Sequence, residues 1–268
     1  MAVYATSDWH GCGNVANKVF DFLKPNDKLY FLGDAIDRGP DGIELFNRLV
    51  SDSRVIMIKG NHEELMEQCL PALIKNENHQ FTDHWLFSNG GLDTWTAIKD
   101  ISKEKIMNYV RMIQCMPLSA EYISPNGHKV ILEHAGYSPF IAPYRTHNPV
   151  WDRGHFYDSW SDELGYMEGK NVYLVHGHTP VQYLKAYYGY KDQPAKTIED
   201  YIEERQYLRD RIKTDEELIL PKVIQYCDGH KFDIDMCTIA SHRIALLDLD
   251  TFEKIYFDDE KAQKERNK

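Results

Sequence analysis

The chain has 268 residues, enough for one large α/β domain with a sizeable core. Its formal net charge of −11 argues against generic nucleic-acid binding, because an acidic chain repels a phosphate backbone. No apolar run approaches the roughly 20 residues that cross a bilayer, so we expect no membrane partner. The five cysteines are scattered without a CxxC pair, which favours the reducing cytoplasm over a disulfide framework or a zinc–thiolate site.

The first part of the chain alternates between short apolar runs and segments with helical spacing. The runs predict strands over residues 1–7, 28–32 and 54–58, and the spacing predicts helices over 14–23 and 42–50. This β-α-β-α-β order predicts a parallel sheet with right-handed crossovers.

The rest of the chain predicts further helices and strands of the same domain, which we place at residues 1–257. Residues 63–114 read as mainly helical. Further strands are expected over 129–133, 171–175, 222–226, 231–239 and 243–248, the last three antiparallel. A charged insertion at about 186–222 is expected to be an exposed helix, and residues 258–268 a charged, frayed tail.

Polar clusters follow five of these strands, at the points where the strands end. The clusters are Asp8 with His10, Asp34 with Asp37 and Arg38, Asn61 with His62, His134, and His178. Ligands of open α/β sheets bind beyond the carboxyl ends of the strands, so we expect the clusters to meet there.

The residue types in these clusters predict a metal centre. Asp8 and His10 are two residues apart on a predicted strand, so their side chains should point the same way. Asp34 is central and could bridge two ions. A nitrogen and oxygen ligand set without sulfur suits Mn²⁺, Fe or Zn better than copper, and its imidazoles disfavour a pure Mg²⁺ or Ca²⁺ site.

Five motifs occur in order over roughly residues 1–180: DxHG, GDxxDRG, GNHE, a strand-ending His-x-Gly and GHT. Together they resemble the phosphoprotein phosphatase branch of the calcineurin-like metallophosphoesterases, which includes bacterial and phage-type serine/threonine phosphatases. The resemblance implies a four-layer α/β sandwich, with two mixed β-sheets flanked by helices and a dimetal site at the strand ends.

The resemblance also implies roles for individual residues. Two divalent ions, Mn²⁺ in the first place and Fe or Zn as alternatives, would be held by Asp8, His10 and Asp34 and by Asp34, Asn61, His134 and His178. His62 would be the general acid, with Asp37 orienting it and favouring its protonated form, and Arg38 would grip the phosphate.

A second phosphate-binding arginine is expected between the two late histidines. Phage-type members carry it in a W-x-R segment, which Trp151-Asp152-Arg153 matches, so we assign Arg153, with Arg145 as the fallback. Three departures from the family pattern stand out. His134-Ala135-Gly136 occurs where HGG is common, a mild change that retains the ligand. His176 precedes GHT and is expected to point away from the metals. Trp9 fills a position where a smaller aliphatic residue is common, and is expected to narrow one wall of the site.

The function implied is hydrolysis of phosphomonoesters, in the first place of phosphoserine or phosphothreonine in proteins. The metals would activate a water for in-line attack, and His62 would protonate the leaving alkoxide. A diadenosine tetraphosphate hydrolase is the alternative, because substrate choice depends on the loops. RNA-end or cyclic nucleotide chemistry is disfavoured by the acidic charge, and a catalytically inactive metal-binding scaffold is disfavoured because every expected position is filled. No oligomeric state is predicted.

Overall fold

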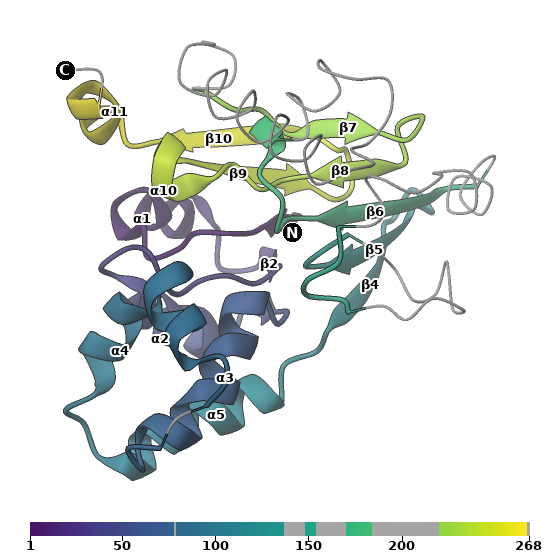
Figure 1. Ribbon diagram of the computed structural model, residues 1–268. Helices are drawn as coiled ribbons and strands as arrows, with labels where there is room; N and C mark the ends of the chain where they lie inside the picture. The colour runs from purple at the N-terminus through teal and green to yellow at the C-terminus, as the bar shows by residue number, and fades with distance from the viewer. Residues whose placement is uncertain (78, 137–147, 154–169, 184–219, 267–268) are drawn as a thin grey trace, which may run out of the picture.

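The computed structural model describes residues 1–77, 79–136, 148–153, 170–183 and 220–266 (Figure 1). Two five-stranded sheets dominate this part of the chain. Sheet A has the strand order β10-β9-β1-β2-β3, and sheet B has the order β4-β5-β6-β8-β7. The predicted α/β sandwich of two mixed sheets flanked by helices is therefore confirmed.

Sheet A contains the parallel strands expected from the start of the chain. Its strands are β1 Val3–Thr6, β2 Lys28–Phe31, β3 Val55–Met57, β9 Arg243–Asp248 and β10 Lys254–Asp258. The first three are mutually parallel, and β9 joins β1 antiparallel. The edge strand β10 was not predicted, because none of its five residues is buried and its ends are charged.

Sheet B has a parallel centre and antiparallel edges. Its strands are β4 Ser119–Ile123, β5 Lys129–Glu133, β6 Val172–His176, β7 Ile224–Tyr226 and β8 Lys231–Asp233. The predicted strand over 231–239 is wrong beyond Asp233, since helix α10 begins at Thr238. Strand β8 is antiparallel to β7, as expected, but parallel to β6. Edge strand β4 was missed because it is largely polar and has no fully buried residue.

Helices connect and flank the sheets. They are α1 Gly13–Phe22, α2 Gly42–Ser51, α3 Asn61–Leu73, the π-helix η1 His84–Ser88, α4 Gly91–Ile98, α5 Lys103–Gln114, α10 Thr238–Ser241 and α11 Glu260–Arg266. Most of the predicted tail is thus a helix rather than frayed chain. No helix in the described ranges is long and apolar enough to span a membrane. The predicted insertion lies outside the described residues, apart from 220–222.

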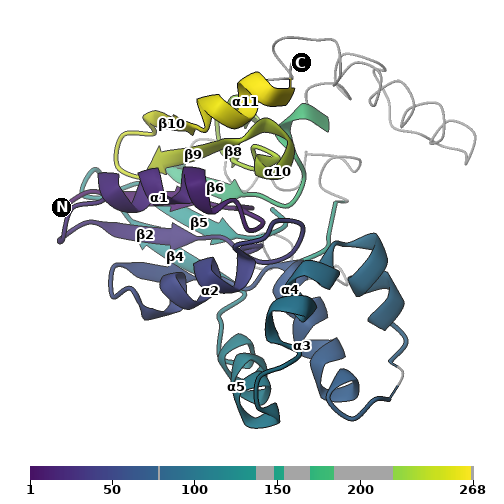
Figure 2. The ribbon, with the colours of Figure 1, turned by 90° about the vertical axis from the view of Figure 1, so that its left-hand side faces the viewer.

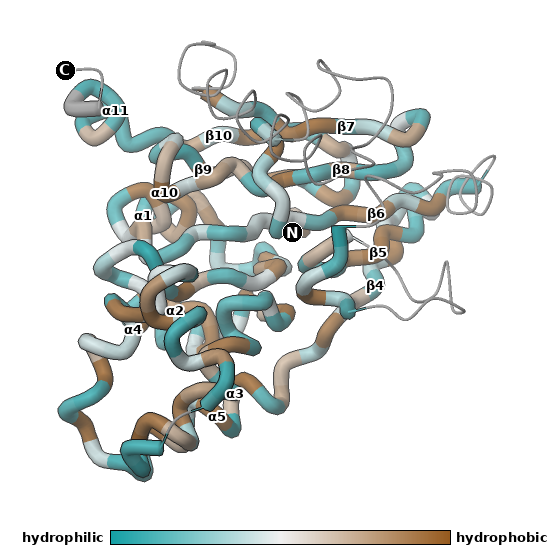
Figure 3. Tube along the Cα trace, viewed as in Figure 1, coloured by the Kyte–Doolittle hydropathy of each residue, from teal (hydrophilic) through white to brown (hydrophobic). Residues whose placement is uncertain are grey.

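Two hydrophobic layers hold the sandwich together. Between the sheets, Val3 and Ala5 of sheet A share a buried cluster with Leu132, Val175 and Phe232 of sheet B. A second cluster joins the other face of sheet A to helices α1 to α5. Figure 3 shows brown, apolar segments in strands such as β5 and β6, which contribute to the layer between the sheets. The parallel strands of both sheets run in the same direction, so their carboxyl ends open on one side of the molecule (Figure 2).

Candidate metal centre

The loops that follow β1 and β2 turn sharply before they reach the site. Strand β1 ends at Thr6, and Asp8 and His10 both adopt left-handed backbone conformations, with φ of 57° and 43°. The expectation that strand alternation aligns these two side chains is therefore wrong. Backbone hydrogen bonds position them instead, from Asp8 N to Gly33 O and from His10 N to Asp34 O, each 3.0 Å.

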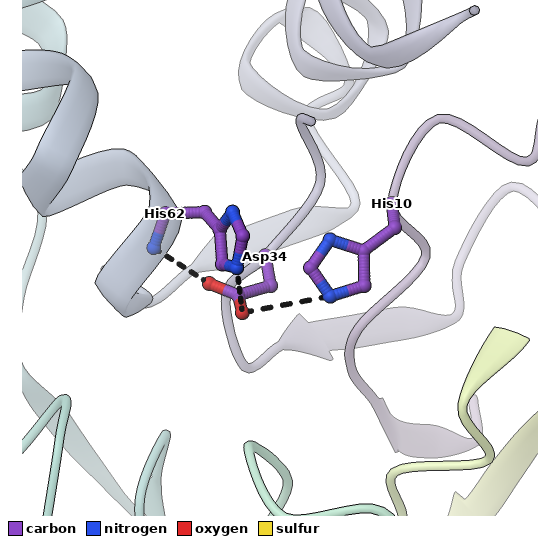
Figure 4. Close-up of side chains that lie close together, drawn as sticks. All are labelled: His10, Asp34 and His62. Atoms are coloured by element: carbon purple, nitrogen blue, oxygen red, sulfur yellow. Dashed lines mark hydrogen bonds and ion pairs between the residues drawn. The ribbon is translucent and has the colours of Figure 1, made fainter. Parts of the chain in front are cut away.

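Asp34 lies at the centre of the site and is buried. Its Oδ2 is 3.7 Å from His10 Nε2 and 3.8 Å from His62 Nε2 (Figure 4). Its Oδ1 is 3.6 Å from His134 Nε2. Since His10 and His134 follow strands of different sheets, one carboxylate faces ring nitrogens from both. Asp8 lies farther out, with Oδ1 4.0 Å from His10 Nε2.

Asn61 links the two late histidines. Its Oδ1 lies 2.9 Å from His134 Nε2 and 2.9 Å from His178 Nδ1. The backbone N–H of His178 donates to Asp8 Oδ2 at 3.0 Å, so the end of β6 in sheet B is tied to the β1 loop of sheet A. The structure therefore brings all six predicted metal-ligand residues into one buried cluster.

The hydrogen-bond partners of these imidazoles indicate that their free nitrogens can bind cations. Burial lowers the pKa of His10, His134 and His178, so each ring is neutral and carries one N–H. His10 Nδ1 faces Ile36 O at 3.0 Å and His134 Nδ1 faces Leu32 O at 2.6 Å, which assigns those N–H groups to the backbone carbonyls. The His134 Nε2 lone pair then points at the acceptor Asn61 Oδ1, whereas the His10 Nε2 lone pair accepts from Arg38 Nη1.

The His134 Nε2 lone pair and Asn61 Oδ1 are 2.9 Å apart and have no proton to share in this tautomer. His178 Nε2 is also buried and has no hydrogen-bond partner among the described residues. Converging nitrogen and oxygen lone pairs around a carboxylate are the donor set that divalent Mn, Fe or Zn prefers, with the second ring nitrogen fixed by a carbonyl. The residues present therefore fit two metal ions.

The Glu63 carboxylate stabilises the turn at Asp34 by accepting backbone hydrogen bonds, a role that was not predicted. Its Oε2 accepts the N–H groups of Asp34 and Gly60, at 2.8 and 3.0 Å, and its Oε1 accepts the N–H of Ala35 at 2.9 Å. The carboxyl is buried, and burial raises its pKa to about 7 although these hydrogen bonds oppose the shift. The only sequence signal was its place in the GNHE motif.

His62 is the second residue of helix α3, after Asn61, and faces Asp37. Its Nδ1 lies 2.7 Å from Asp37 Oδ2, and both side chains are buried. Distance alone groups His62 with His10 and Asp34 as a possible metal ligand, but the bond to Asp37 leaves only Nε2 facing the site. Burial raises the pKa of Asp37 to about 7, and burial together with the Arg38 charge lowers the pKa of His62. The expected preference of His62 for its protonated form is therefore not seen.

Arg38 explains part of that shift. Its Nη1 lies 2.7 Å from His10 Nε2 and its Nη2 lies 2.9 Å from His62 Nε2. The guanidinium thus places positive charge between two ring nitrogens that both accept from it. The Arg38 N–H donates to Gly90 O at 3.0 Å, so the backbone of Arg38 is held by the turn before α4.

Arg153 reaches the site from the segment 148–153. Its Nε donates to Thr179 Oγ1 at 3.0 Å, beside His178. Trp151 holds the same segment against α3, because its indole N–H donates to Glu64 Oε2 at 2.6 Å. The W-x-R segment therefore lies next to the GHT motif, while the fallback Arg145 falls outside the described residues.

The departures from the family pattern at His176 and Trp9 have different outcomes. His176 is buried and points away from the metal cluster, as expected, with Nε2 facing the Tyr226 hydroxyl. Trp9 does not narrow the site. It is fully buried in the core on the helix side of sheet A, where it packs edge-on against Phe20 and Phe31 and donates its indole N–H to Thr6 Oγ1.

Comparisons with known proteins agree with this geometry. A family model described as calcineurin-like phosphoesterase matches residues 1–208. The symmetrical bis(5'-nucleosyl)-tetraphosphatase of Buchnera aphidicola subsp. Schizaphis graminum is 27% identical over 144 residues, which cover 52% of this chain and 46% of the relative. The asymmetrical bis(5'-nucleosyl)-tetraphosphatase PrpE of Oceanobacillus iheyensis is 26% identical over 183 residues, covering 58% and 64%.

The chain therefore spans about half the length of the first of these curated relatives. Among solved structures, a protein serine/threonine phosphatase from Saccharomyces cerevisiae with similarity to human phosphatase PP5 superposes with a TM-score of 0.54. The superposition covers 96% of this chain and 80% of the other at 12% identity, so it bears on the fold alone.

Proposed function

This chain belongs to the calcineurin-like phosphoesterase family, and we propose that it hydrolyses phosphoric esters at a dinuclear metal site, with His62 as the general acid. The observation that carries the proposal is the position of Asp34. Its two carboxylate oxygens lie within 4 Å of His10 on one side and His134 on the other. A single bridging carboxylate would join two half-sites into one centre.

The ligands of the two ions would be Asp8, His10 and Asp34, and Asp34, Asn61, His134 and His178. When bound, Mn²⁺, Fe or Zn ions would neutralise phosphate charge and lower the pKa of an attacking water. Mn²⁺ is our first choice, because the donor set mixes imidazole with oxygen ligands.

Arg38 and Arg153 would bind the phosphate oxygens. A planar guanidinium can donate two parallel hydrogen bonds to a phosphate, a geometry that lysine does not offer. Arg38 donates to both His10 and His62 in this structure, so binding phosphate would draw it away from His62 Nε2. That nitrogen could then carry a proton to the leaving group, with Asp37 holding Nδ1.

Two substrate classes follow, each from one observation. The intact His62–Asp37 pair favours phosphoserine and phosphothreonine esters, since an alkoxide leaving group needs a proton far more than a nucleotide phosphate does. The curated relatives favour dinucleoside tetraphosphates, because both are named as bis(5'-nucleosyl)-tetraphosphatases. We propose the cytoplasm as the location, because all five cysteines are free thiols.

The test is a side-by-side turnover comparison of a phosphoserine peptide and diadenosine tetraphosphate with Mn²⁺ present. Turnover of either substrate that is lost on chelation supports the proposed reaction, and the faster substrate identifies the class. Bound metal without turnover of either substrate, or of p-nitrophenyl phosphate, would overturn the proposal in favour of a metal-binding scaffold.

The role of His62 is tested by His62→Asn. We expect a loss of roughly 100- to 10,000-fold on the phosphoserine peptide, the range that general acid catalysis contributes. The loss on p-nitrophenyl phosphate should be far smaller, because its leaving group needs little protonation. Equal losses on both esters would remove His62 from this role.

A further inference from the structure

The Asp37 carboxylate has two neighbours besides His62, and both come from the helical region after α3. Trp85 Nε1 donates to Asp37 Oδ2 at 2.8 Å, the same oxygen that faces His62 Nδ1 at 2.7 Å. Thr94 Oγ1 donates to Asp37 Oδ1 at 2.5 Å and accepts the Asp37 backbone N–H at 3.0 Å. All four side chains are buried, so both carboxylate oxygens are held from outside the metal cluster.

The backbone around Asp37 also depends on this region. Asp37 and Arg38 are consecutive left-handed residues, with φ of 68° and 67°. Such a conformation is strained for residues other than glycine and persists only where neighbouring structure determines it. The two backbone N–H groups are taken by Thr94 Oγ1 and Gly90 O, which lie in helix α4 and the turn before it.

Trp85 lies in the π-helix η1, and the turn that joins η1 to α4 has little freedom. A Cβ on Gly91 would come within 2.4 Å of Trp85 Nε1, and one on Gly90 within 2.7 Å of the Arg38 side chain. The Trp85 indole and the aliphatic part of the Arg38 side chain are thus packed directly against this turn. The η1–α4 region therefore fixes the position of the loop that carries Asp37 and Arg38.

We propose that Trp85 and Thr94 are positioning residues for the general acid, because their hydrogen bonds hold the Asp37 carboxylate in the one orientation that aims His62 Nε2 into the site. Thr94 anchors Oδ1 and Trp85 anchors Oδ2, so the carboxylate cannot rotate away from His62 Nδ1. This inference rests on the proposed role of His62.

A packing role alone would make a different prediction. Trp85 is fully buried, and a buried aromatic residue stabilises a core by its area whether or not its N–H is bonded. The substitution Trp85→Phe keeps an aromatic ring and removes the N–H donor. Thr94→Val removes the hydroxyl at nearly constant shape, whereas Thr94→Ser keeps it.

The experiment measures kcat for a phosphoserine peptide and for p-nitrophenyl phosphate in these variants. For Trp85→Phe and Thr94→Val we expect a loss of about 10- to 100-fold on the peptide, since small displacements of a catalytic group have effects of that size. The loss on p-nitrophenyl phosphate should be much smaller, and Thr94→Ser should retain most of the peptide activity. Combining Trp85→Phe with His62→Asn should cost nothing beyond His62→Asn alone.

The matched control is Trp95→Phe, which lies on α4 next to Thr94 and packs against the same hydrophobic cluster. It should leave the ratio of the two activities unchanged. Equal losses on both substrates for Trp85→Phe, or a further loss in the combined variant, would overturn the proposal. If Trp85→Phe does not fold, the pair Thr94→Val and Thr94→Ser provides the same test. If Thr94→Val does not fold either, both residues are assigned to fold stability and the proposal is overturned.

The two hypotheses fail in different ways. If His62→Asn itself shows no dependence on the leaving group, the proposed role of His62 is wrong. If His62→Asn shows that dependence and Trp85→Phe and Thr94→Val do not, only the positioning role is wrong.

Discussion

The two halves of the metal centre are built in different ways. The half on sheet A comes from loops after β1, β2 and β3, which are neighbours in both sequence and space. Backbone hydrogen bonds join these loops to one another, and Glu63 accepts three N–H groups beneath them. The half on sheet B consists of single histidines after β5 and β6, which are separated by a long stretch of chain.

This difference shows which contacts fix the residue positions in each half. The sheet A half is fixed locally, by short loops in unusual backbone conformations. The sheet B half is fixed by contact with sheet A, since His134 Nδ1 faces Leu32 O and the His178 N–H donates to Asp8. The geometry of the sheet B half should therefore depend on the packing of the two sheets, whereas the geometry of the sheet A half should not.

The largest effect is expected from Asp34→Asn, which changes the residue that faces both halves. Asparagine keeps the shape and can still accept the His62 N–H, but it removes the negative charge between the two ion positions. We expect a loss of activity of more than about 100-fold, because even supporting residues of metal sites contribute up to that factor. Metal content and kcat would be measured together. Retention of two ions with normal turnover would contradict a bridging role, and Asp41→Asn, outside the cluster, is the control.

A second effect separates the two halves directly. His10→Gln and His134→Gln should each reduce the bound metal from two ions to about one, since each removes a ligand from a different half. Both variants should also lower the free energy of unfolding, by about 1–3 kcal/mol, because His10 is the partner of the buried Ile36 carbonyl and His134 is the partner of the buried Leu32 carbonyl. Metal analysis and urea unfolding of the metal-free proteins test this, and loss of both ions in either variant would remove the distinction between the halves.

The smallest effect compares two neighbouring glutamates on α3. Glu63 supports the sheet A half, whereas Glu64 holds Trp151 in the segment that carries Arg153. Glu63→Gln should cost about 1–3 kcal/mol of stability, because an amide NH₂ would face backbone N–H donors. Glu64→Ala should cost less than about 1 kcal/mol and should raise KM with little change in kcat. Thermal melts and steady-state kinetics distinguish the two; a larger stability loss in Glu64→Ala would reverse the assignment.

Much of the sheet A half could be predicted from sequence. Its strands are short and apolar, each ends in a polar motif, and the β-α-β order determines which edges meet. The reason given for the Asp8 and His10 alignment was nevertheless wrong, because left-handed turns follow the strand. Left-handed conformations at Asp or His leave no reliable mark in a single sequence.

Other features had too weak a signal. Strands β4 and β10 lie at sheet edges and lack the buried residues that make a strand recognisable. Trp85 and Thr94 lie about 50 residues after Asp37, in a helical region without a motif, so only the folded chain shows their contacts with it. Trp9 was expected to line the site because it lies between two ligands in the sequence, but its side chain packs in the core on the helix side of sheet A.

The left-handed residues of the site have a consequence for the evolution of the chain. Asp8, His10, Asp34, Asp37, Arg38 and His178 all have positive φ. At such positions glycine is conformationally easier, by roughly 1 kcal/mol per residue. Mutations to glycine there would remove the proposed site residues, and relief of backbone strain would offset part of the stability lost with their buried hydrogen bonds. A copy of this chain released from selection at the site should therefore lose these residues early.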